Sequence, residues 1–309
     1  MEKVYNQDLY ENLLFNVLDQ NTLRNLLAYK FVHSNKKFYQ YRSFDINGYN
    51  LQNLKNNQIY LNNPQNFNDP FDCFFTANFN DYIRDELLKS KEKLISELDD
   101  NFNLSDEERY EAIKYLESDE LFNQLNITQI ITKQDKYQDL ENLKKTLQNV
   151  FKVSCFSTDN TNLLMWSHYA KNHQGFCIEY DISKIEMNHT FRSNFWPVIY
   201  KTKTLDLLLL KKTKKIIDNN PTLTPYLRII IGTIKPKDWC YEKEWRFIQR
   251  NIDNDLYTMP IKPSCVYLGA KISSDNKQII KEILREQSIP CKQMKLKPGY
   301  FSLEALSDS

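Results

Sequence analysis

Apolar side chains recur every three or four positions over residues 1–30, as in Leu9 and Leu13. The stripe is interrupted at residues 19–22 and resumes at Leu23. This spacing is that of one face of a helix, so the pattern predicts N-terminal helices within residues 1–30. We expect their apolar stripe to pack against the core rather than to face a partner.

Shorter runs rich in β-branched and aromatic residues, bounded by turn residues, predict strands. They lie at residues 37–44, 59–61, 151–158, 175–181, 197–200, 239–249, 265–269 and 291–296. Helical spacing returns at residues 46–57, 204–217, 224–234 and 275–286. Strands and helices follow one another without regular βαβ alternation, which favours an α+β fold around a central mixed or antiparallel sheet.

Residues 80–150 differ from the rest of the chain because their apolar positions belong to charged, amphipathic helical stretches. Ser105 and Glu108 have the spacing of a capping box, which marks the start of a helix. Strand patterns resume directly afterwards, at residue 151. We therefore expect a single α+β domain over residues 1–309, with residues 80–150 as a helical insertion.

One stretch, LMWSHYAKNHQGFCIEYD from Leu164 to Asp181, concentrates unusual side chains. It holds two of the four histidines and one of the four tryptophans of the chain. Gly175 separates a helical run from an apolar, β-rich run, and a glycine is a common helix stop. We expect a helix-to-strand turn here and take the stretch as the centre of a candidate site.

Composition excludes several classes of protein. Lysine and arginine total 41 and aspartate and glutamate 40, which gives no electrostatic support for a dedicated nucleic-acid binder. With only five glycines, the chain has no glycine-rich phosphate loop. The six cysteines are scattered without a CxxC pair, and neither a signal peptide nor an apolar run of membrane-spanning length is visible. We therefore expect a reduced, cytoplasmic protein that does not bind membranes.

Polar residues suited to a phosphate-bearing sugar lie on three of the predicted strands. Arg42 ends one strand, Ser157 and Thr158 end another, and Glu242 and Glu244 share one face of a third. An arginine donates paired hydrogen bonds to phosphate. A hydroxyl group at a strand end can hold a ribose. A glutamate beneath that ribose can stabilise the positive charge that develops as a glycosidic bond breaks.

Aromatic residues and histidines near the centre are further candidates. Trp166, Tyr169 and Tyr41 could stack on a planar base, and His168 could lie at the edge of a pocket. His168 and His173 are five residues apart, which places them on different faces of a helix. No cysteine pair accompanies them, so we expect no metal site.

A purely structural interpretation of the same residues stays open. Glu242, Lys243, Glu244 and Arg246 would belong to an exposed ladder of ion pairs on a sheet. Arg42 would pair with Asp69 or Asp72 in the loop that follows the second predicted strand. The aromatic residues would then be part of the core.

Five motifs in order carry a family resemblance: YRSF, NPQNFNDPFDC, LMWSHYAKNHQGFCIEYD, CYEKEWRFI and IKPSCVYLGAKIS. Together, over about residues 38–303, they resemble the bacterial family catalogued as domain of unknown function 2971. The family name implies no activity.

A second resemblance concerns the order of Arg42, Ser157-Thr158 and Glu242-x-Glu244. It is similar to the motifs of ADP-ribosyltransferases of the arginine, serine-threonine, Glu-x-Glu class. That resemblance implies a split sheet that grips NAD as substrate, with Arg42 on its phosphate or ribose. It also implies that Ser157 supports the site, that Glu244 is catalytic and that Glu242 assists the acceptor.

The leading hypothesis is therefore a cytoplasmic ADP-ribosyltransferase or NAD glycohydrolase, acting as a toxin or a phage-defence effector. The alternative is a non-catalytic module that binds a nucleotide or a partner protein, which fits the near-neutral charge and the aromatic centre. A third hypothesis is a metal-dependent nuclease with Asp181, Asp238 and the two glutamates as magnesium ligands. The first two share a nucleotide ligand, and the acceptor and the oligomeric state stay open.

Overall fold

The computed structural model describes residues 6–16, 19–45, 48–76, 105–117, 142, 144–206, 224–251 and 253–307. The chain divides into two compact units. One comprises Met1–Phe74, Leu147–Thr204 and Ile216–Ser309, and the other comprises Phe75–Thr146 and Leu205–Lys215. Most of the predicted insertion thus belongs to the second unit, and its status as an insertion within one domain stays a prediction.

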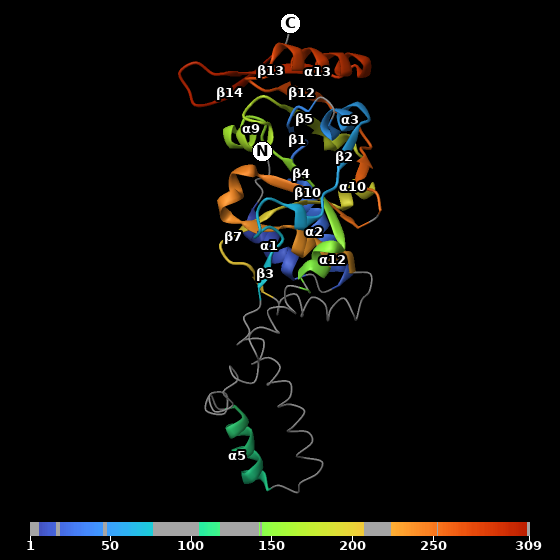
Figure 1. The fold of residues 1–309 in the computed structure, drawn as a ribbon. Coiled ribbons are helices and arrows are strands. Elements are labelled where there is room, and N and C mark those ends of the chain that lie inside the picture. Colours follow the sequence, from blue (N-terminus) through green and yellow to red (C-terminus); the bar gives the residue numbers. More distant parts are fainter. Residues whose placement is uncertain are drawn as a thin grey trace. The chain divides into compact units, whose positions relative to one another are not determined.

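A mixed sheet of eight strands forms the framework of the first unit (Figure 1), in the order β14-β13-β12-β5-β1-β4-β10-β6. Within it only β12 and β13 run parallel, and all other neighbours are antiparallel. The arrangement confirms the predicted α+β fold with a central mixed sheet. The strands are β1 (Lys37–Arg42), β4 (Phe151–Ser157), β5 (Phe176–Asp181), β6 (Phe195–Pro197), β10 (Glu244–Arg250), β12 (Cys265–Leu268), β13 (Cys291–Leu296) and β14 (Leu303–Ser307).

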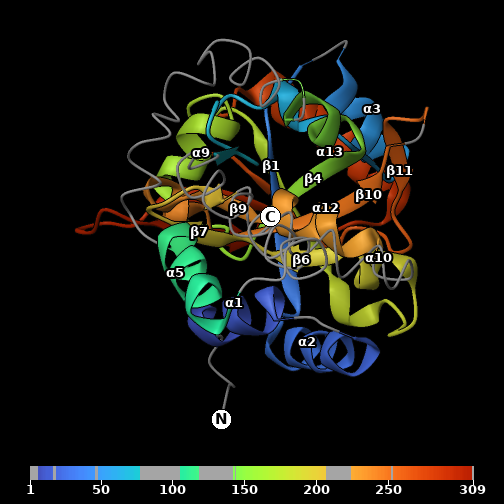
Figure 2. The same cartoon turned by 90° about the horizontal axis from the view of Figure 1, so that it is seen from below.

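Helices lie on both faces of this sheet. Figures 1 and 2 show α9 on one side of the central strands and α3, α10 and α13 on the other. The helices of the first unit are α1 (Gln7–Phe15), α2 (Gln20–His33), α3 (Tyr49–Lys55), α9 (Leu163–Tyr169), α10 (Thr190–Ser193), α12 (Thr224–Gly232) and α13 (Ser274–Gln287). The N-terminal helices are as predicted. Asp19 and Thr22 form the capping box that starts α2, which accounts for the break in the apolar stripe.

Shorter elements complete the description. In the first unit β2 (Gln58–Tyr60) pairs with β11 (Leu256–Thr258), and β7 (Ile199–Lys201) pairs with β9 (Ile234–Pro236). Its 3₁₀ turns are η1 (Pro64–Asn66), η2 (Ile182–Lys184) and η4 (Lys237–Glu242). In the second unit β3 (Phe75–Thr76) pairs with β8 (Leu205–Asp206), and α5 (Asp106–Glu117) is helical. No helix among the described residues has both the length and the apolar character needed to cross a membrane.

Some sequence predictions need correction. The helix expected at residues 204–217 begins as β8, and residues 207–217 lie outside the described part of the chain. The strand expected from residue 239 begins only at Glu244, after the turn η4. Strand β14 was not predicted. The capping box of Ser105 and Glu108 is confirmed, with the Ser105 backbone N–H donating to Glu108 at 2.9 Å.

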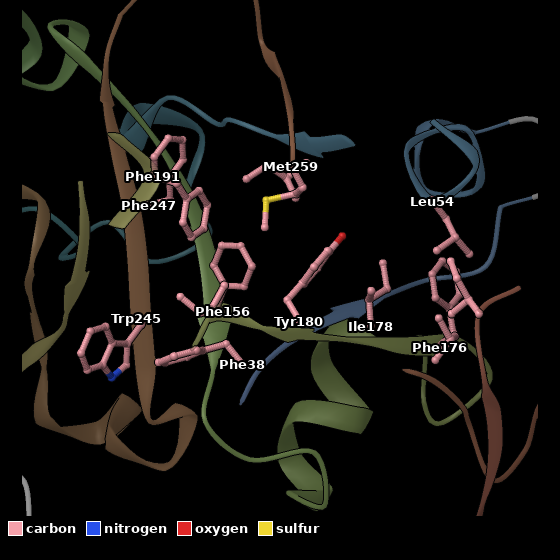
Figure 3. Close-up of a cluster of buried hydrophobic side chains, with 14 of the residues drawn as sticks. Phe38, Leu54, Phe156, Phe176, Ile178, Tyr180, Phe191, Trp245, Phe247 and Met259 are labelled. Carbon is pink, nitrogen blue, oxygen red and sulfur yellow. The ribbon is translucent and has the colours of Figure 1, made fainter. Parts of the chain in front are cut away.

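The main core fills one face of the sheet, where aromatic side chains of neighbouring strands meet. Phe176, Ile178 and Tyr180 alternate along β5 with residues of the opposite face, as a strand requires. Figure 3 shows the rings gathered on this side of the strands, with Leu54 of α3 reaching them from its helix. Burying each such side chain contributes about 1.5–3 kcal/mol, so the core holds the central strands in place.

Candidate functional site

The sheet opens between its two central strands. β1 and β4 pair at a single position, Tyr39 opposite Ser157, whereas β1 pairs with β5 at six positions and β4 with β10 at seven. Beyond that position the side chain of Gln40 bridges the gap, donating to Ser154 Oγ at 2.9 Å and to the Cys155 carbonyl at 3.2 Å. The sheet is thus divided into two halves that a side chain joins.

A cleft of about 980 Å³ lies at this opening. Its walls include Tyr41 and Arg42 of β1, residues 153–157 of β4 and residues of α3. Asn62, Asp72 and residues 66–68 of the intervening loop complete part of the wall. This volume is at the upper end of the range for small-molecule sites, so the cleft can accommodate a ligand as large as a dinucleotide.

Five buried charged side chains form one ion network beside the cleft: Asp72, Lys235, Glu242, Glu244 and Arg246. Arg246 binds Asp72 through two 2.7 Å contacts and Glu244 through contacts of 2.7 and 3.1 Å. The Lys235 Nζ contacts Glu242 at 2.5 Å and Glu244 at 2.8 Å. All except Arg246 line the cleft. The network is therefore buried within the protein, but four of its side chains border the cleft, where a ligand can contact them.

The network contains three carboxyl groups but two cations, so it balances its charge only when one carboxyl is protonated. Burial and the charge of Glu244 raise the pKa of Glu242 to about 7. Burial also opposes the ionisation of Glu244, but Arg246 and Lys235 hold its pKa well below the ordinary value. Glu242 is thus the member that exchanges a proton near neutral pH.

Glu242 does not lie on the strand that the sequence predicted, and the expectation that Glu242 and Glu244 share a strand face is wrong. Glu242 ends the turn η4, and Lys243 then adopts a left-handed conformation with φ 46° and ψ 51°. The chain becomes extended only at Glu244. The two carboxyl groups nevertheless meet, because both bind Lys235.

The remaining contact of Glu242 comes from the central stretch of the sequence. The Tyr169 hydroxyl group, from the end of α9, donates to Glu242 Oε1 at 2.7 Å and lines the cleft. Gly175 makes this placement possible, because a Cβ there would lie 2.1 Å from the Arg42 carbonyl oxygen. The helix-to-strand turn therefore brings α9 and the end of β1 together at the cleft.

The predicted hydroxyl residues, Ser157 and Thr158, form hydrogen bonds with the backbone of neighbouring segments. Ser157 Oγ donates to the Glu242 carbonyl at 2.7 Å and accepts from the Asp159 backbone N–H at 3.1 Å. Thr158 is not among the residues that line the cleft, and its backbone N–H donates to the Lys243 carbonyl at 3.2 Å. Ser157 thus positions the loop that carries Glu242, whereas Thr158 lies outside the cleft.

Arg42 lines the cleft without an acidic partner. Its Nη1 donates to the Tyr41 carbonyl at 3.0 Å, and no carboxylate among the described residues pairs with it. The alternative pairing of Arg42 with Asp72 is wrong, since Asp72 binds Arg246. Burial lowers the pKa of Arg42, which an anionic ligand would counteract. Most of its N–H donors are available to such a ligand.

The aromatic candidates separate into two groups. Tyr41 lines the cleft, and its hydroxyl group donates to the Asp159 carbonyl at 2.6 Å. Trp166 is fully buried and donates to the Asn160 carbonyl at 2.8 Å, so it cannot stack on a ligand. His168 is exposed and lies outside the cleft lining, against Tyr241. The prediction that Trp166 and His168 belong to the binding site is therefore corrected. Trp166 is a buried structural residue, and His168 is a surface residue outside the cleft lining.

Sequence reasoning missed Lys235 and the role of Asp72. Lys235 stands directly after the apolar run of α12, in IIIGTIKP, and a lysine inside so apolar a segment is a signal for a buried ion pair. Asp72 gave no such signal, because its partner Arg246 is 174 residues away in the sequence.

A metal site finds no support in the part of the chain that the structure describes. There, no group of three or more His, Cys, Asp or Glu side chains is arranged to hold a metal ion. The cleft carboxylates Asp72, Glu242 and Glu244 are instead bound to Lys235 and Arg246. The magnesium ligands proposed for a nuclease are thus committed to other partners or lie outside the cleft.

Comparison with known proteins supports the first resemblance. Residues 165–247 match the family described as protein of unknown function (DUF2971). The matched segment includes Tyr169, Lys235, Glu242, Glu244 and Arg246, but not Arg42 or Asp72. No curated protein and no solved structure matches the chain. The resemblance to ADP-ribosyltransferases stays a prediction.

Proposed function

We propose that the cleft binds NAD and that the protein cleaves the bond between nicotinamide and ribose, as an NAD glycohydrolase or an ADP-ribosyltransferase. The observation that carries the proposal is the surplus carboxyl group of Glu242 at a cleft in a divided sheet. A site with one carboxyl group more than it has cations stabilises positive charge. Such charge develops on the ribose when a glycosidic bond breaks.

The reaction assigns a role to each group. The bond between ribose C1′ and the nicotinamide nitrogen breaks, and its electron pair leaves with neutral nicotinamide. Water, or a hydroxyl group of an acceptor, forms the new bond to C1′ and gives its proton to the ionised carboxylate of Glu242. Solvent then removes this proton, and the products are nicotinamide and ADP-ribose or an ADP-ribosylated acceptor.

In this proposal Glu242, rather than Glu244, is the catalytic residue. The oxygens of both carboxylates have protein partners, but Arg246 and Lys235 hold the pKa of Glu244 well below the ordinary value, so only Glu242 can take a proton near neutral pH. Glu244 therefore positions Lys235 and keeps the network charged. Arg42 supplies the unpaired donors for a phosphate of NAD.

The test is the consumption of NAD by the purified protein, with and without a cell lysate that supplies acceptors. We expect release of nicotinamide, with ADP-ribose in the absence of an acceptor. An NAD pool that stays unchanged in both conditions would contradict the proposal. Depletion of NAD in cells that express the protein would support a role as a toxin or a phage-defence effector.

A non-catalytic nucleotide-binding module is the second candidate, and one observation favours it. Both oxygens of Glu242 already have protein partners, Tyr169 and Lys235, so the network is complete without a ligand. This candidate predicts that nucleotides raise the melting temperature without being consumed. It also predicts that binding survives replacement of Glu242 by glutamine.

The pH dependence of the rate follows from the raised pKa of Glu242. Only the ionised carboxylate can take a proton, and its pKa is about 7. We therefore expect kcat/KM for NAD to rise with pH through about 7 and to level off above it. Initial rates measured between pH 5.5 and 8.5 test this, and a profile that is flat or falls over this interval would contradict it.

A further inference from the structure

The end of the cleft beyond Arg42 carries polar groups that the proposed reaction does not use. Tyr39 lies opposite Ser157, which lies opposite Glu244, and Arg42 is three residues further along β1. At about 3.3 Å per residue, this places the end of β1 roughly 10 Å beyond the level of Glu244. Asp45 and α3 follow Arg42 in the chain and line the same cleft.

Three side chains at this end have hydrogen-bonding capacity without a protein partner. Asn53 is 6% exposed, and its side-chain amide group has no partner among the described residues, although it lines the cleft. The Asp45 Oδ1 atom is buried and equally unpaired within the described chain. Within the described residues the Arg42 side chain has a single acceptor, the Tyr41 carbonyl. Buried polar groups are nearly always paired, so unpaired ones around a cavity indicate a ligand.

Local contacts fix these groups in place. Asn50, one turn before Asn53 on α3, donates to the Ser43 carbonyl at 3.2 Å and to Ser43 Oγ at 3.1 Å. This contact ties the start of α3 to the segment that follows β1. The exposed ring of Tyr49, on the same helix, lines the cleft and offers a surface for stacking.

We propose that this end of the cleft is a subsite for adenosine 5′-phosphate, the half of NAD that does not react. The proposal deepens the function proposed above and rests on it. Arg42 binds the phosphate and Asp45 accepts hydrogen bonds from the ribose hydroxyl groups. Asn53 reads the base, because one amide group offers the donor and the acceptor that adenine N7 and its amino group require. Hypoxanthine has an acceptor in place of that amino group, so one of the two contacts is lost.

The test compares the binding of AMP and IMP by calorimetry. We expect the wild-type protein to bind AMP about 10-fold more tightly than IMP. Asn53→Leu, which keeps the size of the side chain, is expected to weaken AMP binding about 10-fold and to abolish the preference. Gln52→Leu is the matched control, because Gln52 is an exposed amide on the same helix outside the cleft. Its AMP affinity is expected to equal that of the wild type.

A second variant tests the ribose contact independently. Asp45→Ala, which removes the acceptor oxygens, is expected to remove the preference for AMP over 2′-deoxy-AMP while keeping the preference for AMP over IMP. The subsite is overturned if AMP does not bind to the wild type, or if folded Asn53→Leu protein keeps the preference for AMP.

The outcomes separate this subsite from the proposed reaction, since AMP contains no nicotinamide and cannot be cleaved in the same way. AMP binding that depends on Asn53, together with unchanged NAD, would refute the reaction and support the subsite. If the protein consumed NAD but showed no Asn53-dependent preference for AMP over IMP, the reaction would be supported and the subsite refuted.

Discussion

Replacement of Glu242 by glutamine is expected to lower the rate of nicotinamide release by about 10²- to 10⁴-fold, the usual contribution of a general base. Glutamine keeps the shape of the side chain and an oxygen that can accept from Tyr169. It removes the surplus negative charge and the capacity to take a proton. The rate at saturating NAD, measured for both proteins at pH 8, gives the result directly.

Two further variants make this measurement decisive. Glu282→Gln changes an exposed glutamate of α13 in the same way and is expected to leave the rate unchanged. Glu244→Gln removes a partner of Arg246 and Lys235, so its loss of activity should accompany a lower melting temperature. If Glu242→Gln stayed active while a fully folded Glu244→Gln did not, the catalytic role would return to Glu244.

The elements that the sequence predicted well are those whose pattern is local. The apolar, β-rich run of β5 and the capping box of Ser105 and Glu108 each depend on neighbouring residues, and both are found. The break in the predicted strand at Lys243 could not be foreseen in this way. A left-handed lysine is uncommon, and the glycine or asparagine that usually announces such a turn is absent.

The candidate site was predicted only in part, because its geometry depends on contacts between distant segments. Arg42 and the two glutamates were identified by chemistry, but their order in the chain could not show that Glu244 is committed to Arg246. The sequence motif also could not show that Trp166 is buried. Its ring packs against that of Tyr41, with ring centres 5.3 Å apart. Pairings of this kind follow from the fold rather than from residue spacing.

The ion network also joins the loop that forms part of the cleft wall to the glutamates of the cleft. Asp72 ends the loop whose residues 66–68 line the cleft, and its two contacts with Arg246 anchor that loop beside β10. The guanidinium of Arg246 lies 5.4 Å from the ring of Phe67 in the same loop. One buried arginine therefore holds together the loop and Glu244, which neighbours Glu242 in the network.

Replacement of Arg246 by leucine is accordingly expected to destabilise the protein by about 3–5 kcal/mol, because it leaves buried carboxylates without a counter-charge. Arg246 is 0% exposed and binds Asp72 and Glu244 as well as the Gly232 carbonyl, at 2.9 Å. For a chain of 309 residues the loss corresponds to a fall in melting temperature of about 5–8 °C. Thermal unfolding of the purified variant measures it.

Arg250→Leu is the matched control, since Arg250 ends the same strand but is exposed. Its effect is expected to stay within about 0.5 kcal/mol, as for other surface substitutions. Adding Asp72→Leu to Arg246→Leu should restore part of the stability, because it removes one of the unpaired charges. If Arg246→Leu cost no more than Arg250→Leu, the network could not be what anchors the cleft loop. The proposed role of Glu242 as a general base would then be weakened, because that role depends on the buried network that raises the pKa of Glu242.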